Sequence, residues 1–186
     1  MKYVFFPGCR IKEGYSDSSK KLAEYIDLKL GIKPAGCCKV DYSLLEEEDC
    51  AILICNNCAN DLESLSSNQN KKYVWEIIDE DVHFPFPNYH GKKMLIQDCD
   101  HGYNDKSIAK RVRSLLTKMN IEFEEMDSMD SIEYGLTREA HRQKVANNAQ
   151  KYENIDIVTY CAICNLAMNK NAKKSSYLLD LLFEKE

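Results

Sequence analysis

Six cysteines lie between residues 9 and 58 of this 186-residue chain, and the spacing of five of them favours metal or cluster chemistry. These five are a single cysteine after the opening apolar run, an adjacent pair, and the two cysteines of a Cys-Asn-Asn-Cys step: Cys9, Cys37, Cys38, Cys55 and Cys58. Thiolates are the soft ligands that hold zinc ions and iron–sulfur clusters. Five clustered thiolates exceed the four positions of a tetrahedral zinc site, so the pattern favours an iron–sulfur cluster.

A second group of three cysteines follows in the other half of the chain: Cys99, Cys161 and Cys164. These thiolates could take a zinc ion with His101 or Asp127 as the fourth ligand, or they could be the remnant of a decayed site. The other three histidines are expected on the surface or in a linker: His83, His90 and His141. Cys50, between Asp49 and an apolar run, is expected to be a packing residue.

Composition narrows the class of protein. Asp plus Glu is 30 against 25 for Lys plus Arg, giving a net charge of −5, and no basic tract occurs. Nucleic acid and anionic membranes are therefore not expected partners. No apolar run approaches the roughly 18 residues of a membrane span, and the first eight residues are too short an apolar run for a signal peptide. We expect a cytoplasmic protein, in which nine cysteines indicate metal or redox chemistry rather than disulfides.

The first half reads as alternating strands and helices. Tyr3–Phe6 predicts a buried strand, and Pro7-Gly8 places Cys9 on the loop after it. A helix is predicted from about Ser16 to Leu30, with Leu22, Ile26 and Leu30 on its buried face. A short helix is predicted over 44–48, a strand over 51–54, and a helix over 60–66. The acidic run 46–49 is expected to be solvated.

The second half repeats this order after a predicted linker at 82–91. Strands are predicted over 93–98, 121–126 and 155–160, and helices over 107–119, 137–152 and from 165 to the end. Cys99 follows its strand as Cys9 follows the first, at an offset of 90 residues. The sequence thus predicts an α/β protein with a mainly parallel sheet, built from two tandem, pseudo-twofold-related βαβ repeats at 1–90 and 91–186, with cysteines on loops at the carboxyl ends of strands.

These motifs together resemble the cysteine-rich CCG domain, which occurs in the cysteine-rich subunit of heterodisulfide reductases and in iron–sulfur subunits of glycolate and lactate oxidases. The resemblance covers nearly the whole chain. It rests on Pro-Gly-Cys after the first strand, Cys37-Cys38, and the two Cys-x-x-Cys steps. Three features depart from the family pattern. Lys39 replaces a glycine, the spacer over 39–54 is short, and Asp127 and Ser128 stand where a second pair would be.

The resemblance implies a [4Fe–4S]-type cluster, in heterodisulfide reductases a noncubane one. The ligands carried over by position are Cys9, Cys37, Cys38, Cys55 and Cys58. It also implies electron transfer to a disulfide or another small thiol-type substrate, with a flavoprotein or ferredoxin-like redox partner. Two alternatives remain on sequence grounds: a zinc-binding structural or assembly protein without catalysis, and a dithiol at Cys55 and Cys58.

Overall fold

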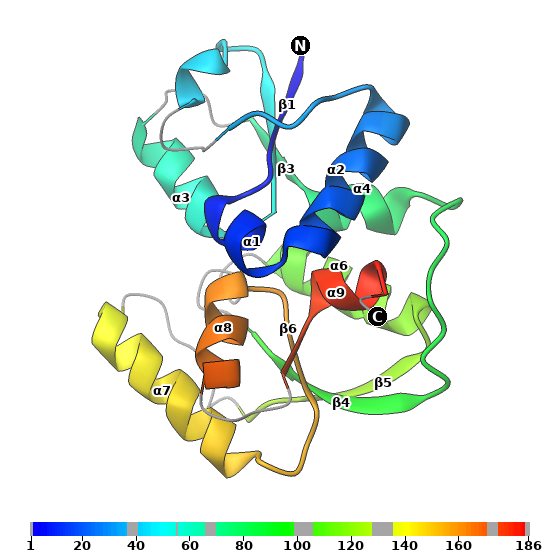
Figure 1. Cartoon of the computed structure of the whole chain (residues 1–186), viewed down its shortest axis with the longest axis vertical. Coiled ribbons are helices and arrows are strands. Elements are labelled where there is room, and N and C mark those ends of the chain that lie inside the picture. Colours follow the sequence, from blue (N-terminus) through cyan, green and yellow to red (C-terminus); the bar gives the residue numbers. More distant parts are fainter. Residues whose placement is uncertain are drawn as a thin grey trace. The chain divides into compact units, whose positions relative to one another are not determined.

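The computed structural model describes residues 2–36, 41–54, 56–65, 70–98, 106–127, 136–170 and 175–184. The chain divides into two compact units, each with its own sheet: unit 1 (Met1–Val82) and unit 2 (His83–Glu184). The division falls within the predicted linker, where residues 81–91 form no helix or strand (Figure 1). That the halves are repeats of one ancestral unit stays a prediction.

Unit 1 contains a three-stranded parallel sheet in the order β1-β2-β3. Its described elements are β1 (Tyr3–Phe6), α1 (Cys9–Gly14), α2 (Ser16–Leu30), the 3-10 helix η1 (Tyr42–Leu44), β2 (Cys50–Leu53), α3 (Asn56–Leu65), β3 (Lys71–Tyr73) and α4 (Val74–Glu80). Pro34 forms a parallel bridge with Phe5 of β1. Because Phe5 also pairs with Ile52 of β2, Pro34 lies on the opposite side of β1.

Unit 2 contains a four-stranded parallel sheet in the order β5-β4-β6-β7. Its described elements are β4 (Lys92–Gln97), α6 (Lys106–Lys118), β5 (Ile121–Glu125), α7 (Arg138–Lys151), β6 (Ile157–Thr159), α8 (Ala162–Lys170), β7 (Ser175–Tyr177) and α9 (Leu178–Leu182). The predicted α/β class with parallel sheets is confirmed. Within the part of the chain that the structure describes, no helix has the length and apolar character needed to cross a membrane.

Apolar periodicity predicted the core-facing helices well. Ile108, Val112, Leu115 and Leu116 of α6 are all fully buried, as are Leu22 and Ile26 of α2. Leu30 is the exception, since it ends its helix and is 38% exposed. Gly31 follows it in the left-handed conformation, with φ of 67°, and closes the helix.

Three predictions about local structure are wrong. The helix expected over 44–48 is only the 3-10 turn Tyr42–Leu44. The expected helical tail is interrupted by β7, which pairs with β6. Asp49 is buried rather than solvated, because its carboxylate accepts hydrogen bonds from the backbone N–H groups of Lys2 and Glu46. These hydrogen bonds lower the pKa of Asp49.

Both sheets contain a point at which the order of strands reverses. In unit 2, the chain runs from β4 to β5 on one side and then crosses back to β6 on the other side of β4. In unit 1, the Pro34 segment and β2 flank β1 in the same way. Open parallel sheets bind ligands outside the carboxyl ends of the strands at such a reversal.

Candidate functional site at the carboxyl ends of the strands

In unit 1, three neighbouring parallel segments each lead toward cysteines. The Pro34 segment precedes the adjacent pair by three residues, β1 is followed by Cys9, and β2 is followed by the Cys-x-x-Cys step. The backbone N–H of Ala35 donates to the carbonyl of Phe5 at 2.8 Å, which fixes the first segment against β1. All three segments run in one direction, so their carboxyl ends, which precede these cysteines in the sequence, lie at one edge of the sheet.

Gly8 brings two of these segments into close contact. Its φ of 78° and ψ of 125° lie in a region that side chains disfavour. A Cβ at Gly8 would come within 3.2 Å of the Ile54 Cγ2 atom. Gly8 directly precedes Cys9 and Ile54 directly precedes Cys55, so the chain positions leading to these two cysteines are neighbours.

The described thiols of unit 1 differ in exposure. Cys9 begins α1 and is exposed, whereas Cys58, in the first turn of α3, is 6% exposed. Cys50 is the first residue of β2 and pairs with Tyr3, so it lies at the amino end of the sheet, away from the candidate site, as expected. Burial raises the pKa of its thiol, which suits an inert packing residue.

Three of the five predicted ligands lie outside the described residues: Cys37, Cys38 and Cys55. Gly36, directly before the adjacent pair, and Asp41, three residues after it, are described and lie close together. A Cβ at Gly36 would overlap the carboxylate of Asp41, so a larger residue at position 36 would require this side chain to move. The predicted convergence of all five sulfurs stays a prediction.

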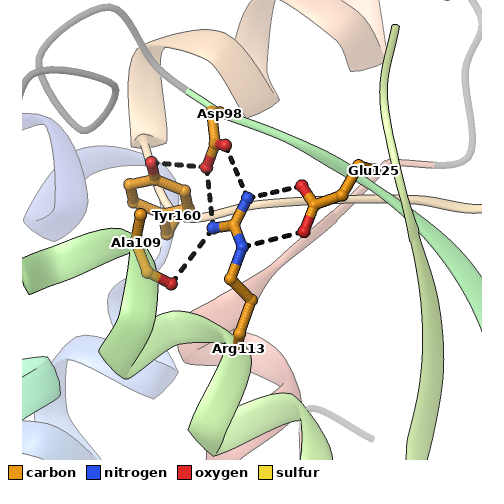
Figure 2. A network of polar contacts seen from close by, with 5 residues as sticks. All are labelled: Asp98, Ala109, Arg113, Glu125 and Tyr160. Atoms are coloured by element: carbon orange, nitrogen blue, oxygen red, sulfur yellow. Dashed lines mark hydrogen bonds and ion pairs between the residues drawn. The ribbon is translucent and has the colours of Figure 1, made fainter. Parts of the chain in front are cut away.

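In unit 2, a polar network joins the strand ends at the corresponding place. Figure 2 shows the Arg113 guanidinium of α6 between the carboxylates of Asp98 and Glu125, which follow β4 and end β5. The Tyr160 hydroxyl, directly after β6, donates to the Asp98 carboxylate at 2.8 Å. Asp98 precedes Cys99 and Tyr160 precedes Cys161, so this bond spans the chain positions that lead to both cysteines.

The guanidinium of Arg113 is saturated with acceptors. Its N–H groups donate to Asp98 at 3.1 and 2.6 Å, to Glu125 at 2.9 and 2.5 Å, and to the Ala109 carbonyl at 3.1 Å. Burial alone lowers the pKa of Arg113, but the hydrogen bonds and charges of the two carboxylates outweigh this effect and raise it. The network therefore holds the strand ends together, and its cation has no further donor for a ligand.

The second Cys-x-x-Cys step forms a compact group with a histidine. The side chains of Cys161 and Cys164 are packed together and are 8% and 1% exposed. The Cys164 Sγ atom lies 3.5 Å from the His141 Nε2 atom of α7. The expectation of a surface or linker histidine therefore holds only in part, because His141 is half-buried and lies in α7 with its ring beside Cys164. The sequence did not predict the contact between His141 and Cys164, because only the packing of α7 against α8 brings these residues together (Figure 1).

The other proposed partners of this group are not confirmed. Asp127 is exposed, and Cys99 and His101 lie outside the described residues. His83 and His90 are exposed, as expected.

Two polar side chains of the unit 2 sheet are buried without a hydrogen-bond partner among the described residues. They are Gln97, at 1% exposure, and Thr159, at 0%, and they pair across β4 and β6. Residues at i and i+2 of a strand share a face, so both side chains lie on the face of Leu95 and Ile157. That face packs against α7 and α8 through Val145 and Met168, which belong to the same core cluster as Leu95 and Ile157.

Helical spacing places two further polar side chains, on α7 and α8, toward the carboxyl ends of the strands. His141 and Cys164 each precede their core residue, Val145 or Met168, by four positions and therefore share its helix face. Thr159 and Gln97 lie two positions beyond the apolar strand residues, in the same direction. We therefore infer one polar layer at the carboxyl end of unit 2: Gln97, Thr159, His141 and Cys164.

Thiolates are soft ligands, so a site built from the cysteines that follow these strands would suit a soft metal or cluster better than a hard cation. Among the described residues, no three His, Cys, Asp or Glu side chains form a group that could hold a metal ion. A complete ligand set would require cysteines outside the described ranges.

No protein-family model, no curated protein and no solved structure matches this chain.

Proposed function

We propose that this chain is an iron–sulfur cluster-binding redox protein similar to the cysteine-rich subunit of heterodisulfide reductases. In this proposal Cys9, Cys37, Cys38, Cys55 and Cys58 ligate one [4Fe–4S]-type cluster at the strand ends of unit 1. The protein would work in a reducing cytoplasm with a flavoprotein or ferredoxin-like partner. Its electrons would pass to a small disulfide or another small substrate.

One observation supports the proposal above the others. Three adjacent parallel segments of unit 1 run toward these cysteines in the same direction, and Gly8 and Ile54 bring two of them into contact. Thiols on separate loops meet only if the fold delivers them to one edge, which is what a shared cluster requires. The same arrangement leaves Cys50 at the other end of the sheet.

When bound, the cluster would supply one-electron transfer at a potential set by its type, hydrogen bonds and exposure. Cys9 and Cys58 would hold the cluster in different ways. The exposed Cys9 would hold an edge near solvent, and the buried Cys58 would anchor the opposite side to α3. Since the two differ in exposure, a partner or substrate would approach from the side of Cys9.

Reconstitution with iron and sulfide under anaerobic conditions tests the proposal. We expect iron and acid-labile sulfide in the purified protein, together with a brown visible absorbance. Cys38→Ser should abolish most of this absorbance. Cys50→Ser is the matched control and should leave it unchanged, because Cys50 starts β2 at the far end of the sheet.

Zinc binding is the alternative outcome. One equivalent of zinc, with no iron or sulfide retained after reconstitution, would replace the cluster by a structural site. Equal losses of absorbance in Cys38→Ser and Cys50→Ser would likewise contradict the proposed ligand set.

A further inference from the structure

The Cys161–Cys164 step of unit 2 differs from a bare Cys-x-x-Cys in having a base beside its second sulfur. His141 Nε2 lies 3.5 Å from Cys164 Sγ, and the two cysteine side chains are packed together. We propose that Cys161 and Cys164 form a redox dithiol that reduces a small organic disulfide, with His141 as the proton acceptor for Cys164. This activity is separate from the cluster proposed for unit 1.

The two cysteines have different positions on α8. The Cys161 carbonyl accepts the first helical hydrogen bond, from the Asn165 N–H at 3.0 Å, so Cys161 is the N-cap residue. The N–H groups of a first helical turn stabilise negative charge on a sulfur at this position. Cys161 is also the more exposed of the pair, at 8% against 1%. Cys161 therefore attacks the substrate, and Cys164 resolves the intermediate.

The reaction balances in two steps. The Cys161 thiolate attacks one sulfur of the disulfide RSSR, forming a Cys161–S–SR bond and releasing RS⁻, which takes up the proton that the Cys161 thiol gave to solvent. Cys164 then transfers its thiol proton to His141 Nε2, attacks Cys161 Sγ, and releases the second RS⁻, which is protonated from the imidazolium. The net reaction converts RSSR and two thiols into two RSH and one internal disulfide.

The surroundings favour a small substrate. Both sulfurs are nearly buried, so a bulky or protein disulfide would not reach Cys161 without rearrangement. His141 lies on α7, which contacts α8, and Val145 one turn further is in the core cluster. The imidazole is thus held by a packed helix rather than by a loop, which keeps it beside Cys164 through both steps.

A single-turnover experiment with bis(2-hydroxyethyl) disulfide tests the proposal on the full-length, anaerobically reduced protein without cluster reconstitution. Trypsin cleavage after Lys151 and Lys170 gives one peptide that contains Cys161 and Cys164 and no other cysteine. We expect this peptide to lose two hydrogen masses as two equivalents of mercaptoethanol appear. Cys164→Ser should trap the mercaptoethanol adduct on Cys161.

The His141→Gln variant tests whether His141 accepts a proton or only supports the structure. It should slow formation of the internal disulfide about a hundredfold, while the Cys161 adduct still forms and accumulates. His90→Gln, at an exposed histidine of the same unit, is the matched control and should behave as wild type.

Three results would overturn the proposal. One is an internal disulfide that closes at the wild-type rate in His141→Gln. Another is a first adduct that forms on Cys164 rather than Cys161. The third is chelator-reversible protection of both thiols by one equivalent of added Zn²⁺, which would make them metal ligands. None of these results bears on the iron content of unit 1, so the two proposals fail independently.

Discussion

The two units have similar strand orders, with the Pro34 segment beside β1 in the place of β5, but they join their strand ends by different means. In unit 1, the positions before Cys9 and Cys55 meet through Gly8 and the apolar side chain of Ile54. In unit 2, the equivalent positions before Cys99 and Cys161 meet through a hydrogen bond from Tyr160 to Asp98, supported by Arg113. The same topology thus allows either a glycine contact or a charged network at the edge where ligands bind in open parallel sheets.

The units also differ in what covers this edge. Between the Pro34 segment and β2, the described part of unit 1 contains only the 3-10 helix Tyr42–Leu44. The corresponding stretch of unit 2 contains the 14-residue helix α7, which carries His141. Helix α7 therefore gives unit 2 a histidine beside the second cysteine of its step. Under the two proposals, one scaffold would support two kinds of thiol chemistry.

Removing the charged centre of unit 2 should have the largest effect. Arg113→Met leaves the partly buried Asp98 carboxylate without its cation, and we expect a loss of about 3 kcal/mol in the free energy of unfolding. Urea unfolding followed by circular dichroism measures the loss. Hydrogen exchange should quicken in β4 and β6 before it changes in β1 and β2.

Lys93→Met is the control, since the Lys93–Glu122 pair is exposed on both sides and should contribute less than about 1 kcal/mol. Equal losses in the two variants would show that the network does not hold the strand ends. If hydrogen exchange in Arg113→Met rose equally in both units, the network would not act on unit 2 in particular.

The glycine contact of unit 1 should give a smaller effect. Gly8→Ala places a methyl group in a strained backbone conformation and against Ile54, so we expect destabilisation of about 2 kcal/mol. Gly31→Ala is the matched comparison, because Gly31 has a positive φ of 67° but no described atom within 4 Å of an added Cβ. In thermal unfolding, the Gly8→Ala variant should have a lower Tm than the Gly31→Ala variant. A reversed ranking would mean that the approach of Gly8 to Ile54 is unimportant.

The smallest expected effect is a gain of stability. Thr159 pairs with Gln97 and has a buried hydroxyl without a partner among the described residues, whereas its counterpart by register in unit 1 is the apolar Leu53. Thr159→Val keeps the shape and removes the hydroxyl, so it should raise the free energy of unfolding by about 1 kcal/mol.

Val158→Thr, which adds a buried hydroxyl on the other face of the same strand, should lower the free energy of unfolding by a similar amount. Differential scanning calorimetry on both variants checks whether stability rises in Thr159→Val and falls in Val158→Thr. Destabilisation by Thr159→Val would indicate that its hydroxyl binds a group in the folded protein.

The sequence by itself determined the α/β class, most strands and the amphipathic helices, because apolar periodicity reports directly which residues face a core. It also determined that cysteines follow β1, β2, β4 and β6, since this is a matter of order along the chain. It missed β3 and β7, because the segments Lys71-Lys72-Tyr73 and Ser175-Ser176-Tyr177 are too short and polar to predict strands. Each is stabilised by pairing with a neighbouring strand, β3 with β2 and β7 with β6.

Only the tertiary structure decided which side chains meet at the strand ends. The pairs Gly8–Ile54, Asp98–Tyr160 and Cys164–His141 are separated by 46, 62 and 23 positions in the sequence. No local propensity encodes such contacts, because they depend on the crossover connections that set the order of strands. His141 lies on a highly polar helix that the sequence alone marks as solvated, and its partner becomes visible only once α7 packs against α8. Long-range packing, rather than the motif, therefore places a histidine beside the second Cys-x-x-Cys step.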